Sequence, residues 1–188
     1  MSLAKSIIQS WTGRYTVYGN PEYADCVIGF AFGYRGKRKQ AKPGLSNQDL
    51  ASIAMRRYGK LPKIFQIEIA EAYCDMEAPD CNDPRKIFRV YASRKIMGYL
   101  DTREVADQAK QIMDRHKWKS AVILAHPYHI PRVVAVCQKL GIKPIVTSEL
   151  RGGVEFDLSS SQKWTRSLGE WRGKEPLAMI YYKLKGWV

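Results

Sequence analysis

Two short segments that are apolar over nearly their whole length, and a third that is rich in β-branched residues, constrain the fold of this chain most. Ala24–Phe32 carries one charged side chain, Lys63–Ala70 is rich in isoleucine, and Ser120–Ala125 is apolar after its first residue. Continuous apolar runs of this length are typical of strands buried on both faces, as in a parallel sheet covered by helices. Two further candidate strands are the segments 143–147 and 154–158.

Segments with helical spacing alternate with these strands. The pattern predicts helices over 46–59, with Ser46 and Asp49 as a capping box, from Asp101 to about His116, and over 131–140, which Gly141 ends. Two closing helices are expected over 159–171 and 176–185, and a loop over 71–83. The segment 84–100 fits a helix or a strand around 87–91, and the pattern does not decide between them.

Alternation of strands and helices predicts an α/β fold, Rossmann-like and doubly wound, with a mostly parallel sheet and helices on both faces. The 188 residues are expected to form a single domain with a core at about 24–150, an N-terminal extension and C-terminal helices. A chain of this length can bury a full core without disulfides.

The charge balance predicts an anionic partner. The chain has 31 Lys and Arg residues against 18 Asp and Glu residues, a formal net charge of +13, and an excess of this size attracts nucleic acid, anionic lipid or phosphorylated small molecules. A solvated basic surface explains the same charge equally well. The basic residues cluster in the segments 35–42, 85–95 and 115–119. No nucleic-acid-binding motif accompanies them, so nucleic acid is a possible partner without a motif.

No apolar run approaches the roughly 18 residues that a membrane-spanning helix needs, so no integral membrane segment is expected. The N-terminal apolar patch is too short for a signal peptide, which predicts a cytoplasmic protein. Cys26 and Cys137 are expected to be buried, and Cys74 and Cys81 have no metal-site spacing. No metal site is predicted.

Polar residues collect where the predicted strands end, which is where parallel sheets bind ligands. Gly33, Arg35 and Gly36 follow the first strand and could bind an anion, although an ordinary turn explains them too. Behind the 120–125 strand come His126, Tyr128, His129 and Arg132, at the start of a helix whose N–H groups and arginine suit an anion. Thr102 and Glu104 open another helix, where helix capping alone explains the glutamate.

Three of these segments resemble the YdcF-like family, the YdcF, SanA and ElyC group, which is catalogued as a domain of unknown function. The similar segments are the strand and turn Ala24–Gly33, the Thr102-x-Glu104 helix start and the strand followed by Tyr128-His129-x-x-Arg132. The chain differs in having Ala31-Phe32 and Ala70-Glu71-Ala72 where members carry glycine-rich turns. The resemblance implies a Rossmann-like fold, a nucleotide-like ligand, with S-adenosylmethionine binding in one branch, and site roles for Gly33, Thr102, Glu104, Tyr128, His129 and Arg132.

Together these observations predict a protein that binds a small anionic, nucleotide-like ligand, S-adenosylmethionine or another nucleotide. The predicted binding residues are Gly33, Arg35, Gly36, Glu71, Thr102, His126, Tyr128 and Arg132. For a transferase or hydrolase, His129 with an ordinary pKa near ~6.5 is the expected general acid or base, and Glu104 the expected second catalytic residue. The sequence does not decide whether the protein is an enzyme. The alternative is a nucleic-acid-binding protein without catalytic activity.

Overall fold

The computed structural model describes residues 3–37, 41–90 and 100–188, and these contain one five-stranded parallel sheet. Its strands are β1 (Cys26–Gly29), β2 (Lys63–Gln66), β3 (Ile87–Val90), β4 (Ser120–Leu124) and β5 (Lys143–Ile145), in the spatial order β3-β2-β1-β4-β5. The central strand β1 pairs in parallel with β2 and with β4. The predicted doubly wound α/β fold is confirmed.

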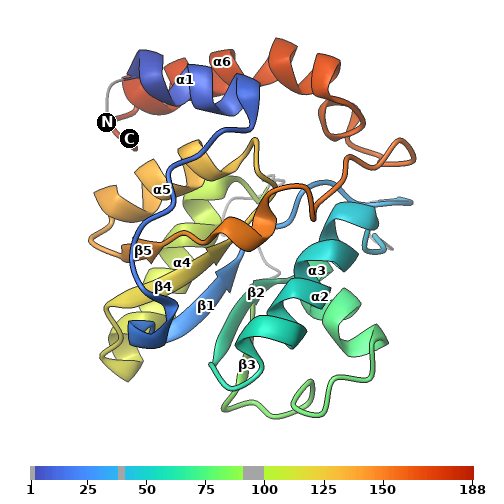
Figure 1. Cartoon of the computed structure of the whole chain (residues 1–188), viewed down its shortest axis with the longest axis vertical. Helices are drawn as coiled ribbons and strands as arrows, with labels where there is room; N and C mark the ends of the chain where they lie inside the picture. The colour runs from blue at the N-terminus through green and yellow to red at the C-terminus, as the bar shows by residue number, and fades with distance from the viewer. Residues whose placement is uncertain (1–2, 38–40, 91–99) are drawn as a thin grey trace.

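The helices cover the sheet in two layers, with a further pair outside them (Figure 1). On one face lie α2 (Leu45–Tyr58) and α3 (Ile67–Asp75), and on the other α4 (Thr102–His116) and α5 (Ile130–Lys139). The outer pair, α1 (Leu3–Thr12) and α6 (Leu168–Leu184), packs together over α5. Short 3₁₀ turns occur at Pro21–Tyr23, Ser148–Leu150 and Lys163–Thr165. No helix within the described ranges is long and apolar enough to cross a membrane.

Burial on both faces explains why the central strands read as continuous apolar runs. All four residues of β1 are buried, as are the last four of β4. The predicted helix beginning after Asp101 is confirmed, because the Asp101 carboxylate accepts the Glu104 N–H at 2.9 Å and caps α4. The predicted 131–140 helix is α5.

The strand predicted over Lys63–Ala70 is wrong in its second half. β2 ends at Gln66 and α3 begins at once, so the loop expected over 71–83 begins only after Asp75. Ile69, Ala70, Ala72 and Tyr73 are buried with helical spacing. A short apolar run rich in isoleucine does not distinguish a strand from a buried helix, and packing of α3 against α2 decides the outcome.

The capping box predicted at Ser46 and Asp49 is also wrong. Gly44 occupies the N-cap position of α2. The Ser46 hydroxyl instead donates to the Glu155 carbonyl, and the Asp49 carboxylate accepts the Glu155 N–H at 3.0 Å. Both side chains therefore fasten the segment around residue 155 to α2. That segment is irregular, so no strand forms at 154–158.

The C-terminal segments differ from expectation as well. Residues 159–167 are irregular apart from the 3₁₀ turn, and α6 runs from Leu168 through Pro176, with the Ser167 hydroxyl accepting the Glu170 N–H at 3.4 Å. Burial of Trp171, Glu175, Met179 and Tyr182 along one face holds this helix despite its proline. Part of the undecided 84–100 segment forms β3, and residues 91–99 lie outside the described residues. α1 was not predicted.

A buried ion pair lies at the amino end of β2. The Lys63 ammonium at the start of β2 is fully buried and donates to Asp80 at 2.8 Å and to the Gly59 and Leu61 carbonyls. The Tyr73 hydroxyl donates to the other Asp80 oxygen at 2.7 Å. Burial raises the pKa of Asp80, but the hydrogen bonds from Lys63 and Tyr73 outweigh it and the pKa lies below its usual value.

We expect Asp80→Asn to lower the free energy of unfolding by about 3 kcal/mol, because the Lys63 charge is left buried without its counterion. Urea denaturation measures this difference. Asp75→Asn, which changes an exposed carboxylate of the same segment, should alter stability by less than about 0.5 kcal/mol. Equal effects of the two substitutions would show that the buried pair is unimportant.

Candidate functional site

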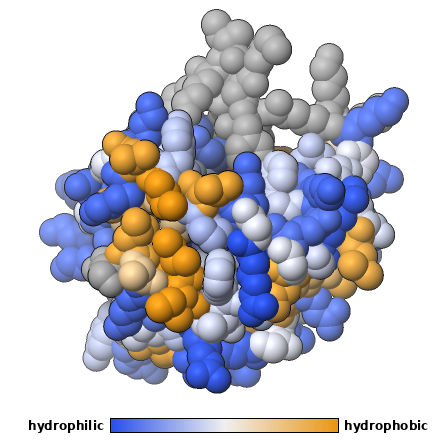
Figure 2. Space-filling view, turned by 90° about the horizontal axis from the view of Figure 1, so that it is seen from above, coloured by the Kyte–Doolittle hydropathy of each residue, from blue (hydrophilic) through white to orange (hydrophobic). Residues whose placement is uncertain are grey.

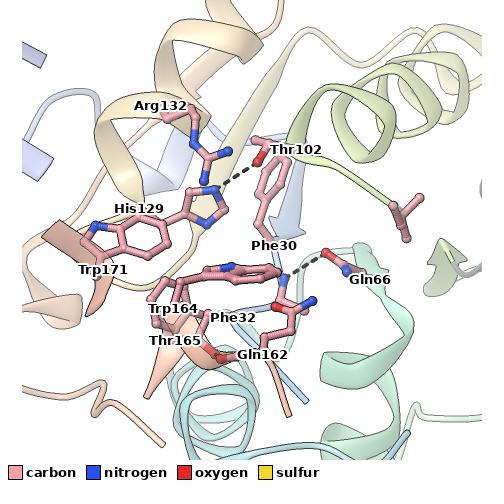
Figure 3. A pocket seen from close by; sticks show the side chains of 13 residues that line it. Phe30, Phe32, Gln66, Thr102, His129, Arg132, Gln162, Trp164, Thr165 and Trp171 are labelled. Atoms are coloured by element: carbon pink, nitrogen blue, oxygen red, sulfur yellow. Dashed lines mark hydrogen bonds between the residues drawn. The ribbon is translucent and has the colours of Figure 1, made fainter. Parts of the chain in front are cut away.

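A pocket lies where the strand order reverses, between the carboxyl ends of β1 and β4. From β1 the chain crosses to α2 on one face, and from β4 to α5 on the other, which opens a crevice between them. Figure 3 shows the side chains around it. The pocket is lined by Phe30, Ala31, Phe32, Gly33, Gln66, Leu100, Thr102, His129, Arg132, Gln162, Trp164, Thr165 and Trp171.

His129 joins two of these elements. It occupies the N-cap position of α5, and its Nε2 lies 3.0 Å from the Thr102 hydroxyl at the start of α4 (Figure 3). The imidazole is buried, and its Nδ1 has no hydrogen-bond partner among the described residues. A buried polar atom without a partner is costly. Trp171 Nε1 at the same pocket also has no partner among the described residues, so these two ring nitrogens are sites for a ligand or water.

Burial lowers the pKa of His129 well below its usual value, and the charges of Arg132 and His126 lower it further. The imidazole is therefore neutral at pH 7. The expected pKa near ~6.5 was wrong, because it took no account of burial beside a guanidinium. Neutral His129 can accept or donate one hydrogen bond at Nδ1, depending on its tautomer.

Arg132 is held by the C-terminal helix. Its Nε donates to Glu175 Oε1 at 3.0 Å, and its guanidinium lies over the Trp171 and Tyr182 rings at 5.7 and 5.2 Å. Trp171, Glu175 and Tyr182 share the buried face of α6. Burial raises the pKa of Glu175 to about 7, although Arg132 opposes the rise. One face of α6 therefore sets the position of the arginine in the pocket.

Side-chain amides hold the loop after β1 against the pocket. The Gln66 amide oxygen accepts the Ala31 N–H at 3.0 Å, and the Asn47 amide oxygen accepts the Phe32 N–H at 2.9 Å. Asn47 also donates to the Gly33 carbonyl at 2.8 Å. The backbone N–H groups of Ala31 and Phe32 are thus already used within the protein and do not form the anion cradle that a glycine-rich turn would provide.

The enclosed part of the pocket is small and its walls are aromatic. Its volume is about 40 Å³, where one ordered water needs at least about 10–15 Å³. It has room for two or three waters or for one group of similar size at the end of a larger ligand. The rings of Phe30, Phe32, Trp164 and Trp171 surround this space.

Arg35 and Gly36, both predicted to bind ligand, do not line the pocket. Arg35 forms two hydrogen bonds with Asp157, at 2.8 and 2.9 Å, and the Gly36 carbonyl accepts the Ser161 hydroxyl. Asp157 also accepts the Leu45 N–H at 3.2 Å. These contacts fasten the 157–161 segment to the β1–α2 connection, so the Arg35 charge is already paired.

His126 and Tyr128 lie in an aromatic cluster behind the pocket wall. The His126 ring stacks on Phe32 with centroids 4.0 Å apart and lies 4.4 Å from Phe156. Tyr128 packs 5.4 Å from Phe156 and against Gly13. Burial lowers the pKa of His126 to about 3. His126 supports Phe32, Tyr128 packs behind His126 and Phe156, and neither residue is among the lining residues.

The two predicted acidic residues also lie outside the lining set. Glu104 accepts a hydrogen bond from Gln108, one turn along α4, at 2.9 Å. Glu71 is half-buried on α3, and burial together with Asp75 raises its pKa. Of the predicted site residues, the pocket brings together Gly33, Thr102, His129 and Arg132.

Sequence reasoning missed the wall that the C-terminal segment supplies. Gln162, Trp164, Thr165 and Trp171 all come from residues that were assigned to closing helices. A signal was present in the spacing of Trp171, Glu175 and Tyr182, which places a carboxylate between two aromatic rings on one helix face. A carboxylate in that setting indicates a buried cationic partner.

None of the family models, curated proteins or solved structures compared with the chain matches it. Within the described residues, no group of three or more histidine, cysteine, aspartate or glutamate side chains could hold a metal ion.

Gly33 tests how closely the C-terminal segment packs on the pocket loop. Its φ is +79°, and a Cβ there would lie 2.4 Å from Thr165 Oγ1 and 2.5 Å from Ser160 Oγ. We expect Gly33→Ala to destabilise the protein by at least about 2 kcal/mol, since strain and displacement of this segment add. Gly141→Ala is the control, because its φ is +76° with nothing within 4 Å, and strain alone should cost about 1 kcal/mol. Thermal unfolding measures both variants. Equal decreases in stability for Gly33→Ala and Gly141→Ala would contradict the close packing.

The two buried histidines should make the protein sensitive to acid. Unfolded histidine titrates near ~6.5, whereas the folded chain takes up these protons only at lower pH. Below about pH 6.5 the unfolded state then binds more protons than the folded state. The free energy of unfolding therefore decreases as the pH is lowered. The pKa of Glu175 is raised from 4.5 to about 7, so between these pH values the folded state binds the extra proton. This carboxyl therefore offsets the loss of stability that one histidine causes there.

Replacing His126 with phenylalanine isolates one of these contributions. As the pH is lowered from about 6 to 4, the unaltered chain should lose about 1.4 kcal/mol of unfolding free energy per pH unit because of His126, and His126→Phe should not. The difference in stability between the variant and the unaltered chain should therefore grow in favour of the variant by this amount per unit. Urea titrations at several pH values measure it. Parallel pH profiles for His126→Phe and the unaltered chain would refute the burial of a neutral His126.

Proposed function

We propose that this protein binds a small anionic, nucleotide-like ligand at the crevice between β1 and β4. The observation that carries the proposal is the meeting of Arg132, His129 and Thr102 around one small cavity at the topological switch point. This is the place where open parallel sheets bind ligands, and a guanidinium is the side chain best suited to a carboxylate or phosphate.

The size and walls of the pocket suggest how such a ligand would lie. The enclosed volume of about 40 Å³ fits only the charged end of the ligand, a phosphate or a carboxylate. The flat ring of Trp164, which is half-buried at the pocket wall, suits a planar ring, as a nucleobase provides. The carboxylate of S-adenosylmethionine and a phosphate of another nucleotide both satisfy this description, in agreement with the resemblance to the YdcF-like family.

His129 and Arg132 would have different tasks in this site. Arg132 would contribute the charge, partly balanced by Glu175, and neutral His129 would contribute one hydrogen bond at Nδ1 while Thr102 holds its ring. A bound anion would raise the pKa of His129, because it favours the imidazolium. Group transfer or phosphoester hydrolysis is the chemistry we propose for a proton-accepting imidazole in this position.

A thermal-shift titration with ATP, AMP, S-adenosylmethionine and sugar phosphates tests ligand binding. At about 100 times the dissociation constant a ligand adds about 2.7 kcal/mol, which should raise the melting temperature by roughly 5–10 °C. The test variant is Arg132→Gln combined with Glu175→Gln, because Arg132→Gln alone would leave the fully buried Glu175 unpaired. We expect this double variant to fold and to lose the shift.

The control is Arg103→Gln, which removes an arginine that pairs with Asp107 on the surface of α4 and should keep the full shift. No shift with any ligand in the unaltered chain, or the same shift in the double variant, would overturn the proposal. Binding only to DNA or RNA, with an affinity that falls steeply with salt and does not depend on Arg132, would favour the nucleic-acid alternative instead.

A further inference from the structure

The two outermost helices expose more apolar surface than any other part of the described chain. Nine large apolar side chains are exposed among the described residues, and six of them lie on α1 and α6. We call this surface the α1–α6 face, and it consists of Ile8, Trp11, Leu177, Ile180, Tyr181 and Leu184, between 43% and 82% exposed. Figure 2 looks onto this layer and shows apolar residues gathered on one part of it, with hydrophilic residues around them.

The α6 helix is apolar on two opposite sides. At about 100° per residue, Leu177, Ile180 and Leu184 are centred roughly 180° from the buried face of Trp171, Glu175, Met179 and Tyr182. The inner side holds Arg132, so packing within the chain accounts for it. A helix on the surface of a protein in water is expected to be polar on its outer side. The outer stripe of α6 therefore indicates an apolar environment outside the chain.

The α1 helix gives independent support. Its buried residues are two serines, Ser6 and Ser10, while Ile8 and Trp11 point to solvent. Small polar residues allow α1 to approach α5 and α6 closely, and Arg172 on α6 donates to the Trp11 carbonyl at 2.8 and 2.9 Å. The apolar side chains of α1 thus turn outward beside those of α6.

The charges around these apolar residues have one sign. The exposed charged residues of the two helices are all basic, namely Lys5, Arg172, Lys174 and Lys183, and so is Lys185 directly after α6. Lys174 and Lys185 project on one side of the apolar stripe of α6, and Arg172 and Lys183 on the other. The two glutamates of α6 are half-buried or buried. A second copy of this face would be repelled by its charge, whereas an anionic surface would be attracted.

We infer that the α1–α6 face docks the protein on the surface of a bilayer rich in anionic phospholipid. Apolar side chains between basic ones, with a tryptophan and a tyrosine among them, are the features of a helix that lies in a lipid headgroup region. Each lysine or arginine near an anionic bilayer contributes about 1 kcal/mol of attraction. The helices would lie along the surface, since none is able to span a membrane.

Flotation of the full chain with lipid vesicles tests this inference. We expect it to float with vesicles of equal parts phosphatidylcholine and phosphatidylglycerol, and not with vesicles of phosphatidylcholine alone. High salt should weaken the binding. Leu177→Ser with Leu184→Ser should reduce it at least about tenfold, because the two side chains no longer enter the bilayer. Both leucines are exposed, at 66% and 82%, so the melting temperature should not change.

Leu158→Ser is the matched control, because Leu158 is 79% exposed but lies outside the α1–α6 face. It should bind vesicles as the unaltered chain does. Equal loss of binding in both variants, equal binding to both kinds of vesicle, or no flotation at all would overturn the inference. So would a dimer in size-exclusion chromatography that the double variant dissolves, since the face would then be an interface between copies. None of these outcomes depends on the pocket ligand.

Discussion

The ion pair between Arg132 and Glu175 connects α5 to the C-terminal helix α6 and determines the shape of the pocket. The two residues are 43 positions apart, the glutamate is fully buried, and the arginine lies over Trp171 and Tyr182 from the same helix. An arginine at the start of α5 would otherwise extend into solvent. Because α6 holds it, one cationic group stays beside His129 at the carboxyl ends of the strands.

The two sides of α6 face different environments. Its inner side completes the pocket and its outer side forms most of the α1–α6 face. If both proposals hold, a membrane surface and the ligand site would be separated by the thickness of one helix. Any displacement of α6 on the bilayer would then move Glu175 and Trp171, and with them Arg132.

The central part of the fold could be predicted from the sequence because local patterns decide it. β1 and β4 are buried on both faces, so they are apolar throughout, and Asp101 marks the start of α4 with its own carboxylate. The strand ends also identified Gly33, Thr102, His129 and Arg132 correctly as neighbours. Local patterns failed at Ile67–Asp75 and at 159–167, where contacts with α2 and with the loop after β1 determine the conformation.

The sequence by itself determined that this chain forms a parallel sheet with polar residues collected at its carboxyl edge, since that requires only the order of apolar and polar residues. Tertiary structure alone decided which of those residues face the pocket. Arg35 is paired by Asp157, His126 is stacked on Phe32, and His129 is neutral because it is buried beside a guanidinium. Each of these outcomes depends on a partner or on burial that residues distant in the chain supply, and no local pattern encodes such contacts.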